Sequence, residues 1–292
     1  MKVQRFLLIV AAALFVSIML AAPFFAVVSA TPTQSVAFSH PRIPFDQSGG
    51  SSLNWAGYVV TGTTGSVTDV KGSFVVPSFT CSSSGTYVAL WAGIDGYSSN
   101  TVEQAGVLAE CTSTGAAPVY ATWYEFYPAA PVYVTSSVPA SGGDIVYVEV
   151  SYLGNSGFTA TITSYSGTTQ LGSYTASGTV SSAVETSAEW IVERPALCTG
   201  AVCRLSTLAN FETADYGLQY TSLSNTNYAT VSGTTGSIGS FPSSSVVALT
   251  MVSGGHHSQT LASPSSLTDS GTSFIVSQPT SSSGGGGHHG KP

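Results

Sequence analysis

The sequence predicts an all-β fold, built as a single antiparallel β-sandwich with two large sheets. Short runs rich in Val, Tyr, Thr and Phe alternate between apolar and polar residues, which is the pattern of half-buried strands. Gly and Ser, which favour turns, separate these runs. No stretch after residue 30 carries apolar residues at helical spacing over the length of a helix. These observations favour an all-β class over a helical or mixed one.

The predicted strands follow one another along a segment of about 220 to 230 residues, a size that single sandwiches reach. Each is a run of residues with strand propensity. In order, the runs are 54–60, 67–76, 87–94, 120–127, 144–153, 158–165, 187–193, 228–232, 246–252 and 273–276.

The N-terminal residues have the pattern of a secretory signal. Lys2 and Arg5 precede an apolar run from residue 6 to residue 28, and residues 28–30 (VSA) match the small-residue pattern of a cleavage site. We therefore expect residues 1–30 to be a signal peptide that is cleaved. The run is also long enough to cross a bilayer, so an uncleaved anchor is the alternative.

Composition divides the rest of the chain. Residues 31–50 contain Pro and Ser without periodicity, and we expect a short prosegment or linker. Residues 51–278 form the predicted sandwich domain. Residues 279–292 are rich in Ser, Gly and His and cannot bury a core, so we expect a disordered tail.

Charge is scarce in this chain. Of 292 residues, 7 are Lys or Arg and 14 are Asp or Glu, so 7% are charged, against about 25% in ordinary soluble domains. The net charge is -7 and the few cations are scattered, which argues against nucleic acid as a partner. The hydrophobic fraction of 43% is high enough for a folded core. We expect a secreted, extracellular monomer without membrane attachment after signal cleavage.

The four cysteines are expected to form disulfides, because thiols oxidise outside the cell. Three pairings are open, and we favour Cys81 with Cys111 and Cys198 with Cys203. A zinc site lacks the CxxC spacing and a neighbouring His. The His pairs at 256–257 and 288–289 lie in flexible Gly/Ser context, so we predict neither a metal nor a cofactor.

The residue inventory excludes several catalytic chemistries. Four of the five His lie in those two pairs and the fifth is His40, so no imidazole is placed for a Ser-His-Asp or Cys-His site. The HExxH and GxSxG motifs are absent. Residues 269–272 (DSGT) match the aspartic peptidase motif, but it occurs once and that chemistry needs two carboxylates. We therefore interpret it as a turn.

Two carboxylates remain as candidates. Alternation puts Glu125 on one strand face with Trp123 and Tyr127. In the run 187–193, Glu189 shares a face with Ser187, Ile191 and Glu193, whereas Ala188, Trp190 and Val192 face the other way. The alternative for both Glu125 and Glu189 is a structural one, in which the carboxylate lies on a solvent-exposed strand face and has no catalytic role.

Five motifs in order resemble those of the glutamic peptidases (eqolisins). They are residues 54–58 (NWAGY), 91–96 (WAGIDG), 103–106 (EQAG), 123–128 (WYEFYP) and 188–193 (AEWIVE). The resemblance covers about residues 51–276. It implies a secreted acid endopeptidase with a concanavalin-like or jelly-roll-like sandwich, protein or peptide substrates in the cleft of the concave sheet, and a catalytic pair of Gln104 and Glu189.

The resemblance also implies roles and supporting residues. Glu189 would act as general base and then donate a proton to the leaving amine, while Gln104 would orient the water and stabilise the oxyanion. An unperturbed Glu, with a pKa of about 4.3, is partly ionised in acid, where an unperturbed His is protonated. The residues expected to position the substrate or to hydrogen-bond the catalytic pair are Trp91, Asp95, Glu125 and Tyr127, with Trp55 as a weaker candidate.

The chain departs from the family pattern at two places. Glu103 stands where the family has an apolar residue before the catalytic Gln, and Trp190 stands where it has Phe or a similar residue after the catalytic Glu. Alternation sends Glu103 to the face opposite Gln104.

Two other functions fit the same fold class. A jelly-roll glycoside hydrolase would use Glu125 and Glu189 as its two carboxylates, at the short separation that such enzymes need. A non-catalytic module that binds carbohydrate or protein would use the same sandwich without chemistry. Gln104 favours the peptidase, because a glycosidase has no need of it.

Overall fold

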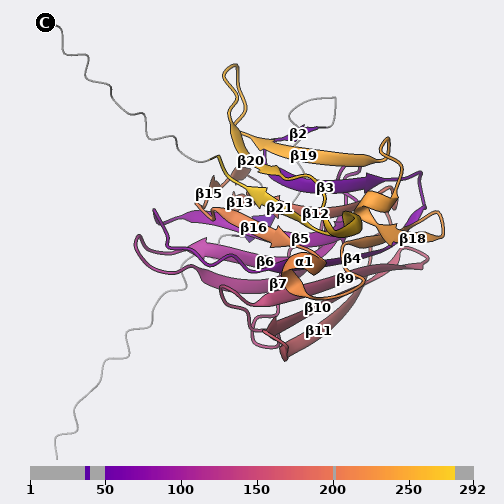
Figure 1. Cartoon of the computed structure of the whole chain (residues 1–292), viewed down its shortest axis with the longest axis horizontal. Helices are drawn as coiled ribbons and strands as arrows, with labels where there is room; N and C mark the ends of the chain where they lie inside the picture. Colours follow the sequence, from indigo (N-terminus) through magenta and orange to yellow (C-terminus); the bar gives the residue numbers. More distant parts are fainter. Residues whose placement is uncertain (1–36, 40–49, 200–201, 280–292) are drawn as a thin grey trace, which may run out of the picture. The chain divides into compact units, whose positions relative to one another are not determined.

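The structure is a computed structural model that describes residues 37–39, 50–199 and 202–279. The predicted signal peptide, most of the predicted prosegment or linker, and all but the first residue of the predicted tail lie outside these residues. The regular secondary structure of the described residues is almost entirely β-strand, with one short helix and two 3-10 turns (Figure 1). The all-β prediction is confirmed.

Most strands run antiparallel to their neighbours. They are β1 (Ala37–Ser39), β2 (Ser51–Ser52), β3 (Trp55–Thr61), β4 (Val67–Val75), β5 (Thr86–Ile94), β6 (Val102–Cys111), β7 (Val119–Tyr127), β8 (Val132–Tyr133), β9 (Ile145–Gly154), β10 (Gly157–Ser166), β11 (Thr169–Thr179), β12 (Ser187–Glu193), β13 (Ala196–Thr199), β14 (Val202–Leu205), β15 (Thr207–Leu208), β16 (Thr213–Tyr216), β17 (Tyr228–Val231), β18 (Thr234–Ser237), β19 (Val246–Val252), β20 (Thr260–Pro264) and β21 (Phe274–Ser277). The helix α1 spans Leu218–Thr221, and the 3-10 turns η1 and η2 span Ile238–Ser240 and Asp269–Gly271.

Two large sheets make up the sandwich. The first sheet has the order β19–β3–β12–β5–β6–β7–β8. The second contains β18–β17–β4–β9–β10–β11, with β16 beside β4 and β21 beside β16. β20 pairs with both β19 and β21, so hydrogen bonding continues from one sheet to the other. The prediction of an antiparallel β-sandwich is confirmed.

The first sheet buries side chains on both faces. One face packs against the second sheet in the main core, which includes Leu90, Ala105 and Trp190. The opposite face, called the site face below, carries a smaller apolar cluster that includes Trp91 and Ile191. The alternation predicted for the run 187–193 is confirmed by these two clusters.

Both predicted disulfides are present. Cys81 pairs with Cys111 and Cys198 pairs with Cys203. The first joins the end of β6 to the segment before β5, and the second joins β13 to β14.

A short strand lies within the predicted prosegment or linker. β1 pairs antiparallel with β13, so that Ala37 lies opposite Cys198 and Ser39 opposite Ala196. Among the described residues, no helix has the length and hydropathy needed to cross a membrane.

Candidate active site

Four neighbouring strands bring the candidate residues into one row on the site face. Glu189 of β12 lies opposite Gly93 of β5, Gly93 lies opposite Gln104 of β6, and Gln104 lies opposite Glu125 of β7. Residues directly opposite one another on neighbouring strands present their side chains to the same face. We call these four residues the central row.

Gly93 separates the two candidate catalytic residues. Neighbouring strands lie about 4.8 Å apart, so the Cα atoms of Glu189 and Gln104 are about 10 Å apart across Gly93. A Cβ at Gly93 would lie 2.7 Å from the carbonyl oxygen of Glu103 and 2.9 Å from Cβ of Gln104. Only glycine fits this position, and it leaves no side chain between Glu189 and Gln104.

The Gln104 amide is held in one orientation. Its Nε2 donates to Oε2 of Glu125 at 2.7 Å, and both side chains are buried. Because this Glu125 oxygen is the acceptor, the nitrogen end of the amide lies on the Glu125 side. The Oε1 of Gln104 is buried and has no hydrogen-bond partner among the described residues. It is therefore left as an acceptor on the site face.

The Glu189 carboxyl group is fully buried, and neither oxygen has a hydrogen-bond partner among the described residues. Burial raises the pKa of Glu189 well above its ordinary value. The nearby Ser187 hydroxyl and Tyr97 backbone oppose this rise in pKa, whereas Asp95 and Glu103 add to it. The ordinary pKa assumed from the sequence is therefore wrong for Glu189, because desolvation favours its neutral form.

Asp95 holds the segment that leads into β12. Its Oδ2 accepts hydrogen bonds from the backbone N–H groups of Val184 and Glu185, both at 2.8 Å. Its Oδ1 accepts from the backbone N–H of Thr186 at 2.9 Å and from the Thr186 hydroxyl at 3.1 Å. Asp95 thus lies outside the central row and fixes the start of the strand that carries Glu189.

The predicted tryptophans form a wall beside the row. Trp91 donates its indole N–H to Oε2 of Glu193 at 2.9 Å, and Asn54 donates to Oε1 of the same carboxylate at 3.2 Å. Trp55 packs edge-on against Trp91, with ring centroids 4.8 Å apart. Glu193 therefore orients Trp91, a role that the sequence analysis did not assign to it.

Aromatic side chains from β7 and β8 continue this wall past Glu125. Tyr127 is partly buried against the apolar cluster of the site face. Tyr133 of β8 lies opposite Trp123 and is 45% exposed. Its pKa is raised by burial and by the charges of Glu125 and Glu110. Tyr133 is not predictable from the sequence pattern, since a two-residue strand gives no alternation signal.

Glu103 faces away from the row, as alternation predicts. It lies opposite Ile94 of β5 and Phe126 of β7, is fully buried, and neither carboxyl oxygen has a hydrogen-bond partner among the described residues. Burial, followed by the charges of Asp95 and Glu185, raises the pKa of Glu103 to about 9. The Thr101 hydroxyl only partly offsets this rise. Glu103 is therefore a neutral acid inside the sandwich.

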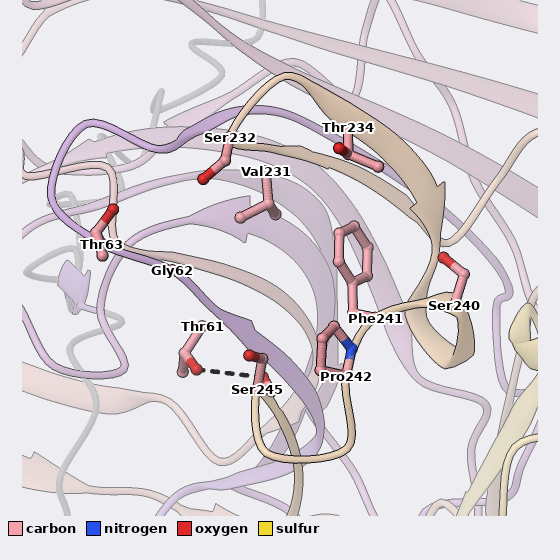
Figure 2. A pocket seen from close by; sticks show the side chains of 10 residues that line it. All are labelled: Thr61, Gly62, Thr63, Val231, Ser232, Thr234, Ser240, Phe241, Pro242 and Ser245. Atoms are coloured by element: carbon pink, nitrogen blue, oxygen red, sulfur yellow. Dashed lines mark hydrogen bonds between the residues drawn. The ribbon is translucent and has the colours of Figure 1, made fainter.

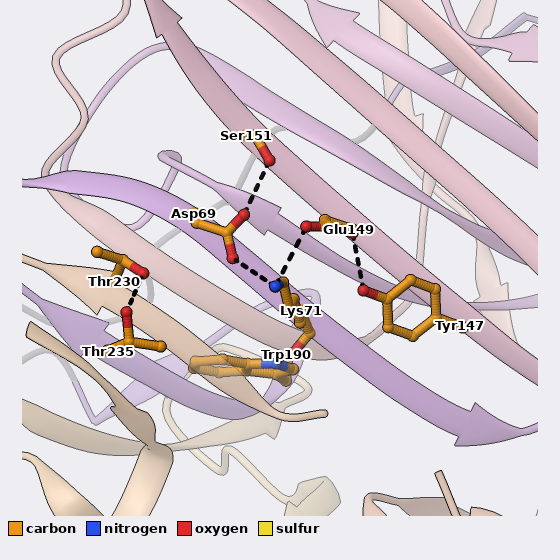
Figure 3. Close-up of polar contacts among 8 residues, drawn as sticks. All are labelled: Asp69, Lys71, Tyr147, Glu149, Ser151, Trp190, Thr230 and Thr235. Carbon is orange, nitrogen blue, oxygen red and sulfur yellow. Dashed lines mark hydrogen bonds and ion pairs between the residues drawn. The ribbon is translucent and has the colours of Figure 1, made fainter. Parts of the chain in front are cut away.

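Trp190 ties the Glu189 strand to the second sheet. Its indole N–H donates to the backbone carbonyl of Lys71 on β4 at 2.9 Å (Figure 3). A Cβ at Gly72 would lie 3.2 Å from Cδ1 of Trp190. Glycine at position 72 therefore leaves room for the indole ring. The Lys71 ammonium forms ion pairs with Asp69 at 3.8 Å and Glu149 at 3.3 Å. The departure from Phe at position 190 thus adds an inter-sheet hydrogen bond.

The two carboxylates of the alternative glycosidase assignment are not neighbours in the row. Glu189 and Glu125 are separated by three strand spacings, about 14 Å between Cα atoms, with Gln104 between them. Among the described residues, no group of three or more His, Cys, Asp or Glu is arranged to hold a metal ion.

Comparison with known proteins decides the family. A model of the peptidase A4 family matches residues 53–259, which is more than half of the chain. The chain belongs to the peptidase A4 family. Aspergillopepsin-2 of Aspergillus niger, a curated protein, is 37% identical over 163 residues, covering 49% of this chain and 56% of that protein. The match thus spans little more than half the length of this relative.

Solved structures of glutamic peptidases share the fold of this chain. Scytalido-glutamic peptidase, solved with a transition state analog inhibitor, matches with a TM-score of 0.61 and 22% identity, covering 78% of this chain and 98% of that chain. Aspergilloglutamic peptidase from Aspergillus niger matches with a TM-score of 0.50 and 27% identity, covering 66% and 99%. The resemblance of this A4 family member to the glutamic peptidases is confirmed.

Proposed function

We propose that this chain is an acid endopeptidase that hydrolyses peptide bonds of proteins with Glu189 and Gln104 as its catalytic pair. Family membership supports the reaction class. The observation that carries the assignment is the central row, where Glu189 and Gln104 flank Gly93 and both present buried acceptors without a hydrogen-bond partner among the described residues.

The attacking water would lie between these acceptors. A water that donates one hydrogen to the Glu189 carboxylate and the other to Oε1 of Gln104 is oriented with a lone pair free to attack a carbonyl carbon. Glu189 takes the proton as the water attacks and then delivers it to the leaving nitrogen.

Gln104 would also stabilise the developing oxyanion. One hydrogen of its Nε2 is donated to Glu125, and the second remains available for the substrate oxygen. Because the amide does not titrate, this donor is present at any acidity. Glu125 is a positioning residue in this scheme, since it keeps the nitrogen end of the amide toward itself.

The protonation state of Glu189 would set the lowest pH at which the enzyme is active. The base is its ionised form, and burial raises its pKa, so we expect activity to rise as the pH increases through that pKa. We place the enzyme outside the cell, because disulfides persist in oxidising compartments and the chain has two.

Two variants test the catalytic pair. Glu189→Gln and Gln104→Ala should each lower the rate of digestion of a denatured protein by roughly a thousandfold at the pH where the parent is most active, given the effects of removing a base or an oxyanion donor. Glu212→Gln and Gln170→Ala, which change exposed residues away from the row, should keep the parent rate. Digestion at the parent rate by either row variant would refute the pair. Absence of acid proteolysis in the processed parent would favour a binding module.

A further inference from the structure

A hollow lies on the outer face of the second sheet, the face turned away from the main core. Its volume is about 360 Å³, within the range of about 300 to 1,000 Å³ that is typical of sites for small ligands. Its walls come from β4, β9, β10 and residues 222–226, which follow α1. We call residues 222–226 the pocket loop, and the hollow the two-tyrosine pocket, after Tyr147 and Tyr165.

Strand alternation places the side chains of Lys71, Tyr147 and Tyr165 on this outer face. Val70 and Val148, which adjoin Lys71 and Tyr147 on their strands, belong to the main core, so Lys71 and Tyr147 point the other way. Tyr165 of β10 pairs with the residue two positions before Tyr147 on β9, so the two tyrosines share a face. Neither tyrosine is part of the main core or packs at its margin.

A buried polar network holds the pocket loop over β4. The hydroxyl of Ser73, a fully buried residue, bonds to the hydroxyl of Thr221 at 2.9 Å and to that of Thr226 at 2.7 Å. The backbone N–H of Ser73 donates to Oδ1 of Asn227, which is also fully buried, at 3.1 Å. These bonds fix both ends of the loop, so the walls of the pocket are in place before a ligand binds, which lowers the entropy cost of binding.

The pocket loop presents polar side chains to the outside. Ser222, Ser224 and Asn225 are exposed, and all three line the pocket. A hydroxyl and an amide can each both donate and accept hydrogen bonds. The loop therefore suits a ligand that carries several uncharged groups of both kinds.

The charges around the pocket do not favour an ionic ligand. The Lys71 ammonium forms ion pairs with Asp69 at 3.8 Å and Glu149 at 3.3 Å (Figure 3), so an anion would gain no net attraction. A cation would meet the Lys71 ammonium, which lines the pocket while neither carboxylate does. Tyr147 donates its hydroxyl to Oε2 of Glu149 at 2.8 Å, which orients its ring (Figure 3).

The lining thus combines two aromatic rings with hydroxyl, amide and ammonium groups. A tyrosine ring offers an apolar face beside a polar tip. A sugar ring has the complementary groups, since its C–H bonds form apolar faces and its hydroxyls surround the rim. We propose that the two-tyrosine pocket binds one pyranose unit of a neutral polysaccharide. The two sheets and the main core separate it from the site face, and the proposal does not depend on the catalytic assignment.

A larger hollow lacks this combination of groups. It has a volume of about 560 Å³ and is bordered by the end of β3, the turn between β17 and β18, and the segment before β19 (Figure 2). Its one aromatic side chain, Phe241, packs against the main core, and no charged or amide side chain lines it. We therefore expect no sugar to bind there.

Calorimetric titration of the full chain with defined hexasaccharides tests the site. The neutral probes are hexasaccharides of glucose, mannose, galactose, xylose and N-acetylglucosamine, and the acidic probe is a hexasaccharide of galacturonic acid with its carboxylates ionised. At least one neutral probe should bind the parent with a millimolar or lower Kd. The acidic probe should bind about tenfold or more weakly than that neutral probe, because its carboxylates lose hydration without a net opposite charge.

Variants of the pocket and of two other places locate the binding. Tyr165→Ala should weaken binding about tenfold or more, the effect of losing one apolar contact surface. Asn225→Gly keeps a left-handed backbone position, with φ of 56°, and should weaken binding roughly threefold to tenfold by removing the amide. Tyr174→Ala removes an exposed tyrosine of β11, and Thr234→Trp fills the larger hollow (Figure 2). Both controls should bind like the parent.

The sugar site is refuted if the parent binds none of the neutral probes at millimolar concentration. It is also refuted if the Tyr165 and Asn225 variants, with the Tm of the parent, keep the parent Kd, or if either control loses as much affinity as they do. Binding of the acidic probe as tightly as any neutral one would refute the neutral preference. None of these outcomes involves proteolysis, so the proposed function is tested separately.

Discussion

At the scale of single residues, the environment of Glu189 decides what chemistry its carboxyl group can do. Burial raises its pKa, the charge of Asp95 raises it further, and the Ser187 hydroxyl and Tyr97 backbone lower it. In the proposed mechanism only the ionised form accepts a proton from water. The groups that stabilise the carboxylate therefore set the lower pH limit of activity.

Ser187 gives a direct test of this relation. Its hydroxyl lowers the pKa of Glu189 by favouring the carboxylate, so Ser187→Ala should raise that pKa and move the acid limb of the kcat/KM profile to higher pH. The plateau rate should change by no more than about twofold, because the base is still ionised there. Ser206→Ala, which changes another buried serine, should leave the limb in place. A limb that stays or moves to lower pH in the Ser187 variant would contradict this account.

At the scale of elements, alternation predicted the strands that have one apolar and one polar or functional face. The run 187–193 coincides with β12, and the run 87–94 misses only the first residue of β5. Two long strands were not predicted. β6 is buried along nearly its whole length, so it lacks alternation, and β11 is mostly exposed and rich in Thr, Ser and Gly.

The sequence predicts which residues form the candidate site, but it does not predict the hydrogen bonds that they make. Glu125 and Glu189 lay on predicted strands whose alternation gave their faces, and a motif identified Gln104 although its strand was not predicted. The bond from Gln104 to Glu125 depends on the register of β6 with β7, and register between strands is not visible in local sequence. The indole bond of Trp190 to β4 depends on how the two sheets pack, which no local pattern contains.

At the scale of the whole molecule, the carboxyl groups favour a fold that is stable in acid. Among the described residues, every Asp or Glu with a resolved shift has a raised pKa, and burial is the largest cause in each case. These residues are Asp69, Glu103, Glu185, Glu189 and Asp215. Raised values mean that the folded chain holds protons that the unfolded chain releases, so stability falls as the pH rises above the ordinary carboxyl range. The low charge content noted in the sequence fits this behaviour.

Glu103 provides the clearest test of pH-dependent stability. Between its ordinary pKa of 4.5 and its folded pKa of about 9, the folded state binds one proton more than the unfolded state. Stability should therefore fall by about 1.4 kcal/mol per pH unit for this group alone. Glu103→Gln resembles the protonated acid but cannot ionise. It should raise Tm by roughly 7–14 °C at pH 7 and change it little at pH 4.

Thermal unfolding of parent and variant at both pH values checks this expectation. Glu212→Gln, which changes an exposed carboxyl group, should behave like the parent at both. An equal change in Tm at pH 4 and pH 7 in the Glu103 variant would show that its ionisation does not limit stability.

The central claim is that Glu189 and Gln104 act as one unit on one water molecule. A double-mutant cycle of kcat/KM on a single peptide, with Glu189→Gln, Gln104→Ala and both together, measures this directly. Groups that act as a unit give strongly non-additive losses, so the double variant should be about as slow as the slower single variant. If the two losses multiply, Glu189 and Gln104 act independently and the proposed pair is wrong.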